Sequence, residues 1–169
     1  MIEKFQYFSS NGIFLDVNLD IDSKEDYLFK NNPETEISKF YQAQSSGIKW
    51  IFNQKTITIH RKNTIISGYP FPNLEKVLII YHNKALIYNQ DGKLLLEINP
   101  PNTYLSELAK KMRNKLYFNS YSIYFPAWIK KNNHLIMQIQ INYNQNWYEL
   151  RELDCETGSL GNVTGEGMR

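Results

Sequence analysis

Apolar residues near the middle of the chain form three short runs separated by polar turns. Residues 76–81 and 85–88 are separated by three residues, and residues 94–98 follow after a connection that contains Asp91-Gly92. An Asp-Gly pair readily adopts the positive φ angles of a hairpin turn. The pattern therefore predicts an antiparallel meander, around which we expect the rest of the chain to pack.

Period-two alternation predicts further strands on both sides of this meander. The clearest example is residues 56–60, where threonine and isoleucine alternate as in a half-buried strand. Residues 134–143 alternate in the same way and are expected to pair with residues 146–153, whose apolar and charged side chains leave the buried face ambiguous. The predicted strands outside the meander are residues 2–8, 13–19, 48–52, 56–60, 64–69, 115–125, 134–143 and 146–153.

Helical spacing of apolar residues occurs between these strands. Residues 34–45 place Ile37, Phe40 and Tyr41 on one face, which we expect to lie on a sheet. The other predicted helices are residues 23–29 and 103–113. Because the strand connections are too short for parallel crossovers, the predicted fold class is α+β, mainly antiparallel β-sheet with two or three short helices packed against it.

The length of 169 residues suits one ordinary domain with a core of its own. We assign residues 1–158 to this domain and expect the glycine-rich residues 159–169 to form a flexible tail. No repeat of fixed length is present, and the chain is short for a propeller. No apolar run approaches the roughly 20 residues of a membrane-spanning helix, and the first residues do not resemble an export signal. We therefore expect a cytoplasmic protein that does not bind membranes.

Histidine and cysteine residues do not form a recognisable catalytic or metal-binding motif. His60, His82 and His134 lack the spacing of a metal site. Cys155 lies between two acidic residues, which raise the pKa of a thiol and oppose nucleophilic chemistry. The lone cysteine also cannot form an internal disulfide, which fits a reducing compartment. These residues predict neither a cofactor nor a metal ion.

Two pairs of carboxylates are candidates for acid–base catalysis. Glu149 and Glu152 form one pair, and Asp16 and Asp20 form the other. Isolated acids at such spacing are usually solvated on a surface. We therefore interpret all four side chains as surface groups and expect no catalytic residue among them.

The net charge of +2 conceals a segregation of charge along the chain. Residues 1–40 carry eight Asp or Glu and four Lys, residues 41–148 carry four acids and thirteen Lys or Arg, and residues 149–169 carry five acids and two Arg. Such segregation can steer a charged partner, although it also fits a solvated surface of mixed sign. The candidate partner-binding residues are Asp16, Asp20, Asp22, Glu25 and Asp26, and the alternative is a basic face of Lys110, Lys111, Arg113 and Lys115. The small net charge and the absence of a nucleic-acid-binding motif predict no direct contact with nucleic acid.

Three features of organisation occur together in this chain. It is a small α+β chain rich in Asn, Lys and Ile, its meander ends in residues 88–101, and it has no active-site motif. In these features it resembles the immunity proteins of bacterial contact-dependent and polymorphic toxin systems. The resemblance covers the organisation of the whole chain and rests on no diagnostic residue pattern. It implies a non-enzymatic protein that binds one cognate toxin domain, often a nuclease, and occludes its active site.

The alternative is a small hydrolase or ligand-binding domain whose site is assembled only in the fold, for example around His60 or His134. The shape of the site discriminates between the two. A deep polar pocket lined by a histidine and a carboxylate would favour the enzyme, whereas a charged face without such a pocket would favour the binding protein.

Overall fold

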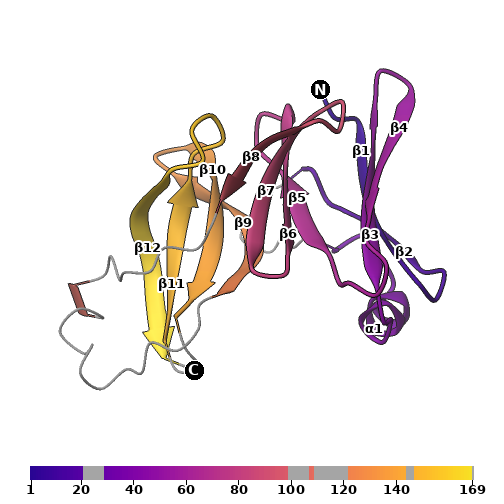
Figure 1. Ribbon diagram of the computed structural model, residues 1–169, viewed down its shortest axis with the longest axis horizontal. Helices are drawn as coiled ribbons and strands as arrows, with labels where there is room; N and C mark the ends of the chain where they lie inside the picture. Colours follow the sequence, from indigo (N-terminus) through magenta and orange to yellow (C-terminus); the bar gives the residue numbers. More distant parts are fainter. Residues whose placement is uncertain (21–28, 99–106, 109–121, 144–146, 169) are drawn as a thin grey trace.

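The computed structural model describes residues 1–20, 29–98, 107–108, 122–143 and 147–168, and their strands form three antiparallel sheets of four strands each (Figure 1). The first sheet holds β2 (Phe14–Asp16), β1 (Lys4–Ser9), β3 (Ser46–Phe52) and β4 (Lys55–His60) in that order. The middle sheet holds β5 (Ser67–Pro70), β6 (Lys76–Tyr81), β7 (Lys84–Asn89) and β8 (Leu94–Ile98), and the third sheet holds β12 (Leu160–Met168), β11 (Trp147–Leu153), β10 (His134–Asn142) and β9 (Ser122–Lys131).

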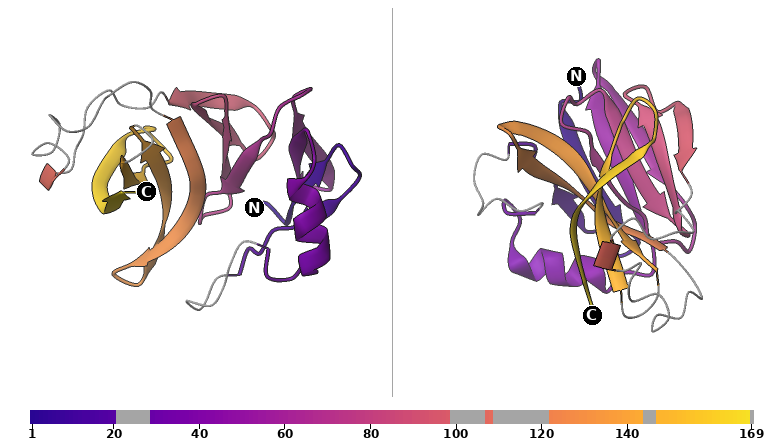
Figure 2. Two further views of the ribbon diagram at one scale, coloured as in Figure 1. Left: turned by 90° about the horizontal axis from the view of Figure 1, so that it is seen from below. Right: turned by 90° about the vertical axis from the view of Figure 1, so that its left-hand side faces the viewer.

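The meander predicted in the middle of the chain is confirmed as β6, β7 and β8. His82 and Asn83 form the first turn with φ angles of 47° and 63°, and Gly92 in the second has a φ of 80°. Residues 77–80 and 85–88 are buried on both faces. Uninterrupted apolar runs suit these two strands, because the middle sheet lies between the other two (Figures 1 and 2).

Three layers of sheet replace the single helix-covered sheet that the sequence predicted. Each sheet has an apolar face that must be buried, and here the first and third sheets bury theirs against the middle one. Among the described residues only one helix, α1 (Glu34–Tyr41), has defined bounds, so the fold is mainly β with a little helix. The predicted helices at 23–29 and 103–113 lie outside the described residues, apart from Phe29 and the helical pair Glu107 and Leu108.

The helix predicted over residues 34–45 is confirmed but ends at Tyr41. The amide N–H groups of Gln42 and Ala43 donate to the carbonyls of Lys39 and Phe40, and these tight i→i−3 bonds close the last turn. Phe40 is buried, whereas Tyr41 is 69% exposed, so the prediction that Tyr41 packs on a sheet was wrong. No helix in the described part of the chain has the length and apolar character needed to cross a membrane.

The third sheet resolves the ambiguous strand near the end of the chain. The predicted pairing of residues 134–143 with 146–153 is confirmed by β10 and β11. Trp147, Glu149, Arg151 and Leu153 are the buried residues of β11, so two charged side chains point into the protein. The edge strand β9 continues to Lys131, beyond the predicted end at residue 125. Pro126 does not end the strand, because it lies at the register shift opposite β10, where the loss of one ladder hydrogen bond is tolerated.

The glycine-rich segment that the sequence predicted to be a flexible tail instead forms β12 and pairs with β11. Its glycines allow this pairing, because the side chains of β11 lie over them. A Cβ atom on Gly167 would lie 2.7 Å from the Tyr148 hydroxyl oxygen and 2.9 Å from two carbons of its ring. The glycine-rich composition of this segment suggested disorder. In the structure, the absence of a side chain on each glycine instead allows β12 to pack closely on β11.

Aromatic side chains with one polar group connect the three layers. Such residues bury a large apolar surface and still satisfy their donor. The connecting hydrogen bonds are Tyr7 Oη to the Gly68 carbonyl at 2.5 Å, Trp50 Nε1 to the Gln90 carbonyl at 2.7 Å, Trp128 Nε1 to the Pro70 carbonyl at 2.7 Å and Tyr69 Oη to the Asn18 carbonyl at 2.6 Å. They fix the sheets relative to one another and so shape the space between them.

Candidate functional site

The predicted partner-binding residues are only partly described. Asp16 ends β2 and is exposed, with its Oδ1 atom 3.5 Å from Lys4 Nζ and 2.5 Å from Gln6 Nε2, which donates to it. Asp20 is also exposed, and its backbone N–H donates to Asn18. The other candidates, Asp22, Glu25, Asp26, Lys110, Lys111, Arg113 and Lys115, lie outside the described residues.

The three histidines lie on three different sheets. His60 ends β4, His82 lies in the turn between β6 and β7, and His134 begins β10. Among the described residues no group of three or more His, Cys, Asp or Glu side chains could hold a metal ion. The structure therefore does not bring the predicted histidines together into one site.

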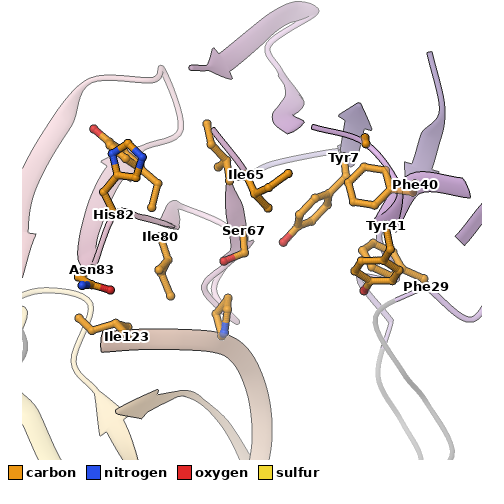
Figure 3. A pocket seen from close by; sticks show the side chains of 14 residues that line it. Tyr7, Phe29, Phe40, Tyr41, Ile65, Ser67, Ile80, His82, Asn83 and Ile123 are labelled. Carbon is orange, nitrogen blue, oxygen red and sulfur yellow. The ribbon is translucent and has the colours of Figure 1, made fainter. Parts of the chain in front are cut away.

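A cleft of about 470 Å³ lies where the first sheet and α1 face the middle and third sheets (Figure 3). One wall is aromatic: Tyr7 and Phe40 pack edge to face with ring centroids 5.9 Å apart, and Phe29 packs against Tyr7 at 5.3 Å. Ile80 of β6 and Ile123 of β9 lie across from them. The floor of the cleft is thus built from buried side chains of all three layers.

Polar and exposed side chains form the rim of the same cleft (Figure 3). His82 and Asn83 project from the β6–β7 turn, and Ser67 lies at the start of β5. Tyr41 and Ile65 are 69% and 56% exposed, so two large side chains at the mouth of the cleft are open to solvent. An apolar floor with a few polar groups at the mouth is the arrangement that binding sites use for an apolar or aromatic group.

Burial controls the chemistry of the tyrosines in the cleft. The hydroxyl of Tyr7 both donates to the Gly68 carbonyl and accepts from the Gly68 N–H, at 2.5 and 2.6 Å. Desolvation raises the pKa of Tyr7 far above its usual value, and it also raises the pKa of Tyr41. A tyrosine hydroxyl is protonated at neutral pH even without this shift, so the Tyr41 hydroxyl can serve as a hydrogen-bond donor at the rim.

Sequence reasoning missed this cleft. Its residues come from β1, α1, the β6–β7 turn and β9, and no local pattern connects them. The one available signal was Tyr41. The helical spacing assigned it to the buried face together with Phe40, although Tyr41 is the last residue of the helix and can point toward solvent there. The described lining residues include His82 but no carboxylate.

A buried charge pair lies on the inner face of β11. Arg151 Nη2 is 2.7 Å from Glu149 Oε2, its Nε is 2.9 Å from the same oxygen, and Tyr143 donates to that oxygen at 2.8 Å. Glu149 is fully buried and Arg151 is 5% exposed. The interpretation of Glu149 as a solvated surface acid was therefore wrong, because the period of β11 directs residue 149 inward and residue 152 outward.

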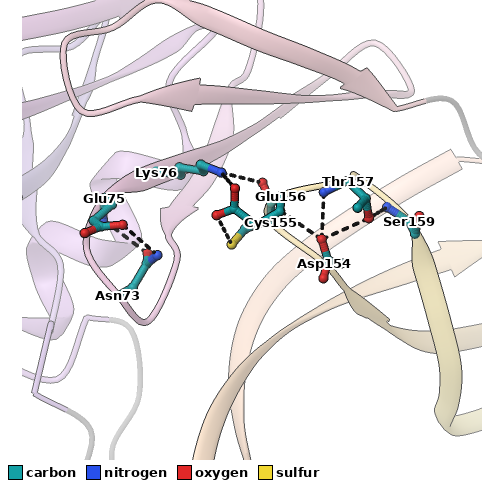
Figure 4. A network of polar contacts seen from close by, with 8 residues as sticks. All are labelled: Asn73, Glu75, Lys76, Asp154, Cys155, Glu156, Thr157 and Ser159. Atoms are coloured by element: carbon teal, nitrogen blue, oxygen red, sulfur yellow. Dashed lines mark hydrogen bonds and ion pairs between the residues drawn. The ribbon is translucent and has the colours of Figure 1, made fainter.

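A second polar network joins the middle and third sheets (Figure 4). Lys76 of β6 donates to the Cys155 carbonyl at 3.1 Å and pairs with Glu156 at 2.6 Å, which lowers the pKa of that carboxyl. The pKa of the Cys155 thiol is raised, first by burial and then by Glu156. The predicted direction is confirmed, and the thiol remains a poor nucleophile at neutral pH.

No protein-family model matches this chain, and no curated protein sequence matches it.

Proposed function

We propose that the protein acts by binding another protein, without turnover of its own, as the resemblance to immunity proteins implies. The partner is then a cognate toxin domain whose active site the bound protein covers. The observation that carries the proposal is the cleft between the sheets, which has the chemistry of a binding site. Its floor is apolar and aromatic, and its described lining contains no carboxylate.

Acid–base hydrolysis fits this cleft less well. A catalytic histidine needs a group that orients it and a second group that exchanges protons with the substrate. His82 lies in an exposed turn at the rim, and no described lining residue is an Asp or a Glu. The alternative of a small hydrolase therefore has less support than a protein that inserts a partner's side chain into the cleft.

The acidic stretch and the cleft are connected through the chain. Phe29, which lines the cleft, follows Asp26 by three residues. In this proposal a basic partner is steered by Asp16, Asp20, Asp22, Glu25 and Asp26 and then inserts a side chain into the cleft. Steering of this kind raises the association rate and weakens as salt is added, whereas the cleft controls how long the complex lasts.

Ile65 offers a direct test of the proposal, because it is exposed and lines the cleft. The resemblance to immunity proteins implies that the cognate toxin is encoded by the neighbouring gene, so the product of this adjacent gene is the partner to test. We expect Ile65→Asp to weaken its binding about 30-fold or more, the loss typical of a central contact of about 2 kcal/mol or more. The measurement is isothermal titration calorimetry of the purified proteins. The matched control is Leu94→Asp, since Leu94 is 46% exposed on β8 and does not line the cleft.

Two results would count against the proposal. Equal loss of affinity in both variants would place the effect outside the cleft. The absence of any binding by wild-type protein, together with hydrolysis of a substrate that depends on His82, would favour the enzyme.

A further inference from the structure

Strand β4 is an edge strand of unusual regularity. Natural edge strands are kept from pairing with other chains by shortness, proline, bulges, a covering segment or charged side chains, lysine above all. Among the described edge strands, β2 has three residues, β5 contains Gly68 and Pro70, and β8, β9 and β12 each show a register shift against their neighbours. By contrast β4 has six residues without proline or glycine, and its register with β3 is unbroken.

The hairpin between β3 and β4 fixes which backbone groups of β4 point outward. Its two-residue turn, Asn53-Gln54, has φ angles of 48° and 62°, as a type I′ turn requires. Lys55 therefore exchanges hydrogen bonds with β3, and every second residue after it does the same. The N–H and C=O groups of the residues between them, Thr56, Thr58 and His60, consequently point away from β3, and no described strand lies on that side.

We propose that β4 pairs with β4 of a second copy of this chain, antiparallel and with Thr58 opposite itself. In this register all three residues with outward-pointing backbone groups form hydrogen-bonded pairs with the second copy, since Thr56 faces His60 and His60 faces Thr56. A shift of two residues in either direction loses one of these pairs. The two first sheets then form one continuous sheet about a twofold axis, which makes a closed dimer with a self-complementary interface.

The side chains of β4 suit this pairing. Thr58 opposite Thr58 on one face and Ile57 opposite Ile59 on the other are favourable cross-strand pairs. The side chains of Thr56, Thr58 and His60 are all exposed in the single chain. Like charges meet at the two ends of the paired strands, where Lys55, the first residue of β4, faces Arg61. Arg61 is drawn aside over the ring of Tyr81. A second copy therefore satisfies the open edge without a buried charge.

A charge introduced at position 58 tests the twofold register, because residue 58 lies opposite residue 58 of the second copy. We expect wild-type protein to form a dimer at micromolar concentrations in sedimentation velocity. Thr58→Lys alone and Thr58→Glu alone should each associate about tenfold or more weakly, because like charges lie opposite each other. An equimolar mixture of the two variants should associate again. Thr58→Pro, which removes one outward N–H and no bond to β3, should remain monomeric.

The controls separate pairing from folding. Thr58→Val keeps a β-branched side chain and should dimerise like wild type, and the charge changes Gln42→Lys and Gln42→Glu after α1 should not affect association. Circular dichroism checks that each variant is folded. A wild-type protein that stays monomeric, single-charge variants that dimerise as tightly as wild type, or a mixture that associates no better than the single variants would each overturn the proposal.

Discussion

Replacing Arg151 with Leu is expected to lower the free energy of unfolding by about 3–5 kcal/mol, which is the usual effect of removing one member of a buried ion pair. Arg151 places two nitrogens within 2.7 and 2.9 Å of Glu149 Oε2, and the Glu149 side chain has no contact with solvent. In the variant the carboxylate keeps its desolvation penalty and loses the guanidinium that offsets it. Equilibrium unfolding in urea measures the change.

Two further variants show whether the charge pair is the cause. Arg61→Leu removes an exposed arginine and should change stability by less than about 1 kcal/mol. Glu149→Met combined with Arg151→Leu removes both charges and should be more stable than Arg151→Leu alone, since no unpaired charge is left in the core. A double variant as unstable as the single one would show that packing of the arginine, and not its charge, explains the loss.

Replacing Gly68 with Ala is expected to destabilise the protein by about 1–3 kcal/mol or more, because Gly68 packs closely against β6 of its own sheet and against Ile48 of the first sheet. A Cβ atom at this position would lie 2.4 Å from the Leu78 carbonyl oxygen and 2.8 Å from Ile48 Cδ1. Backbone oxygen cannot move aside as a flexible side chain can, so β5 must shift. That shift would also disturb both hydrogen bonds between Gly68 and the Tyr7 hydroxyl.

Gly161→Ala provides the matched control for Gly68→Ala. The nearest atom to a Cβ at position 161 is Glu152 Cβ at 3.4 Å, an ordinary contact. Thermal unfolding of the two variants should therefore show a clear decrease in melting temperature for Gly68→Ala and little change for Gly161→Ala. Equal decreases would mean that the effect belongs to glycine in strands generally, and not to the close contact at β5.

Local pattern was sufficient to predict the strands of the central meander, but not β12, which the sequence analysis assigned to a flexible tail. The runs at residues 76–81, 85–88 and 94–98 became β6, β7 and β8, because tight turns and apolar runs are encoded within a few residues. The arrangement of the strands in three layers could not be predicted in this way. It depends on contacts such as Tyr7 to Gly68 and Trp128 to Pro70, which join residues about sixty positions apart.

The candidate site was less predictable than the fold. A period of two shows that Glu149 and Glu152 lie on opposite faces, but it does not show which face is buried. Composition made the segment after residue 158 look unstructured, although its glycines are what allow β12 to pack on Tyr148. The cleft depends on the layering itself, so neither its floor at Ile80 and Ile123 nor its rim at His82 has a signature in the sequence.

The proposal that the cleft between the sheets holds a protein partner can be tested by amide hydrogen exchange. Exchange would be measured by mass spectrometry for the free chain and for the chain bound to the adjacent gene's product. We expect slower exchange in the bound state around Ile65 and Ser67 and in the turn at His82 and Asn83. A stable complex in which these segments exchange as fast as in the free chain, while protection appears elsewhere, would contradict it.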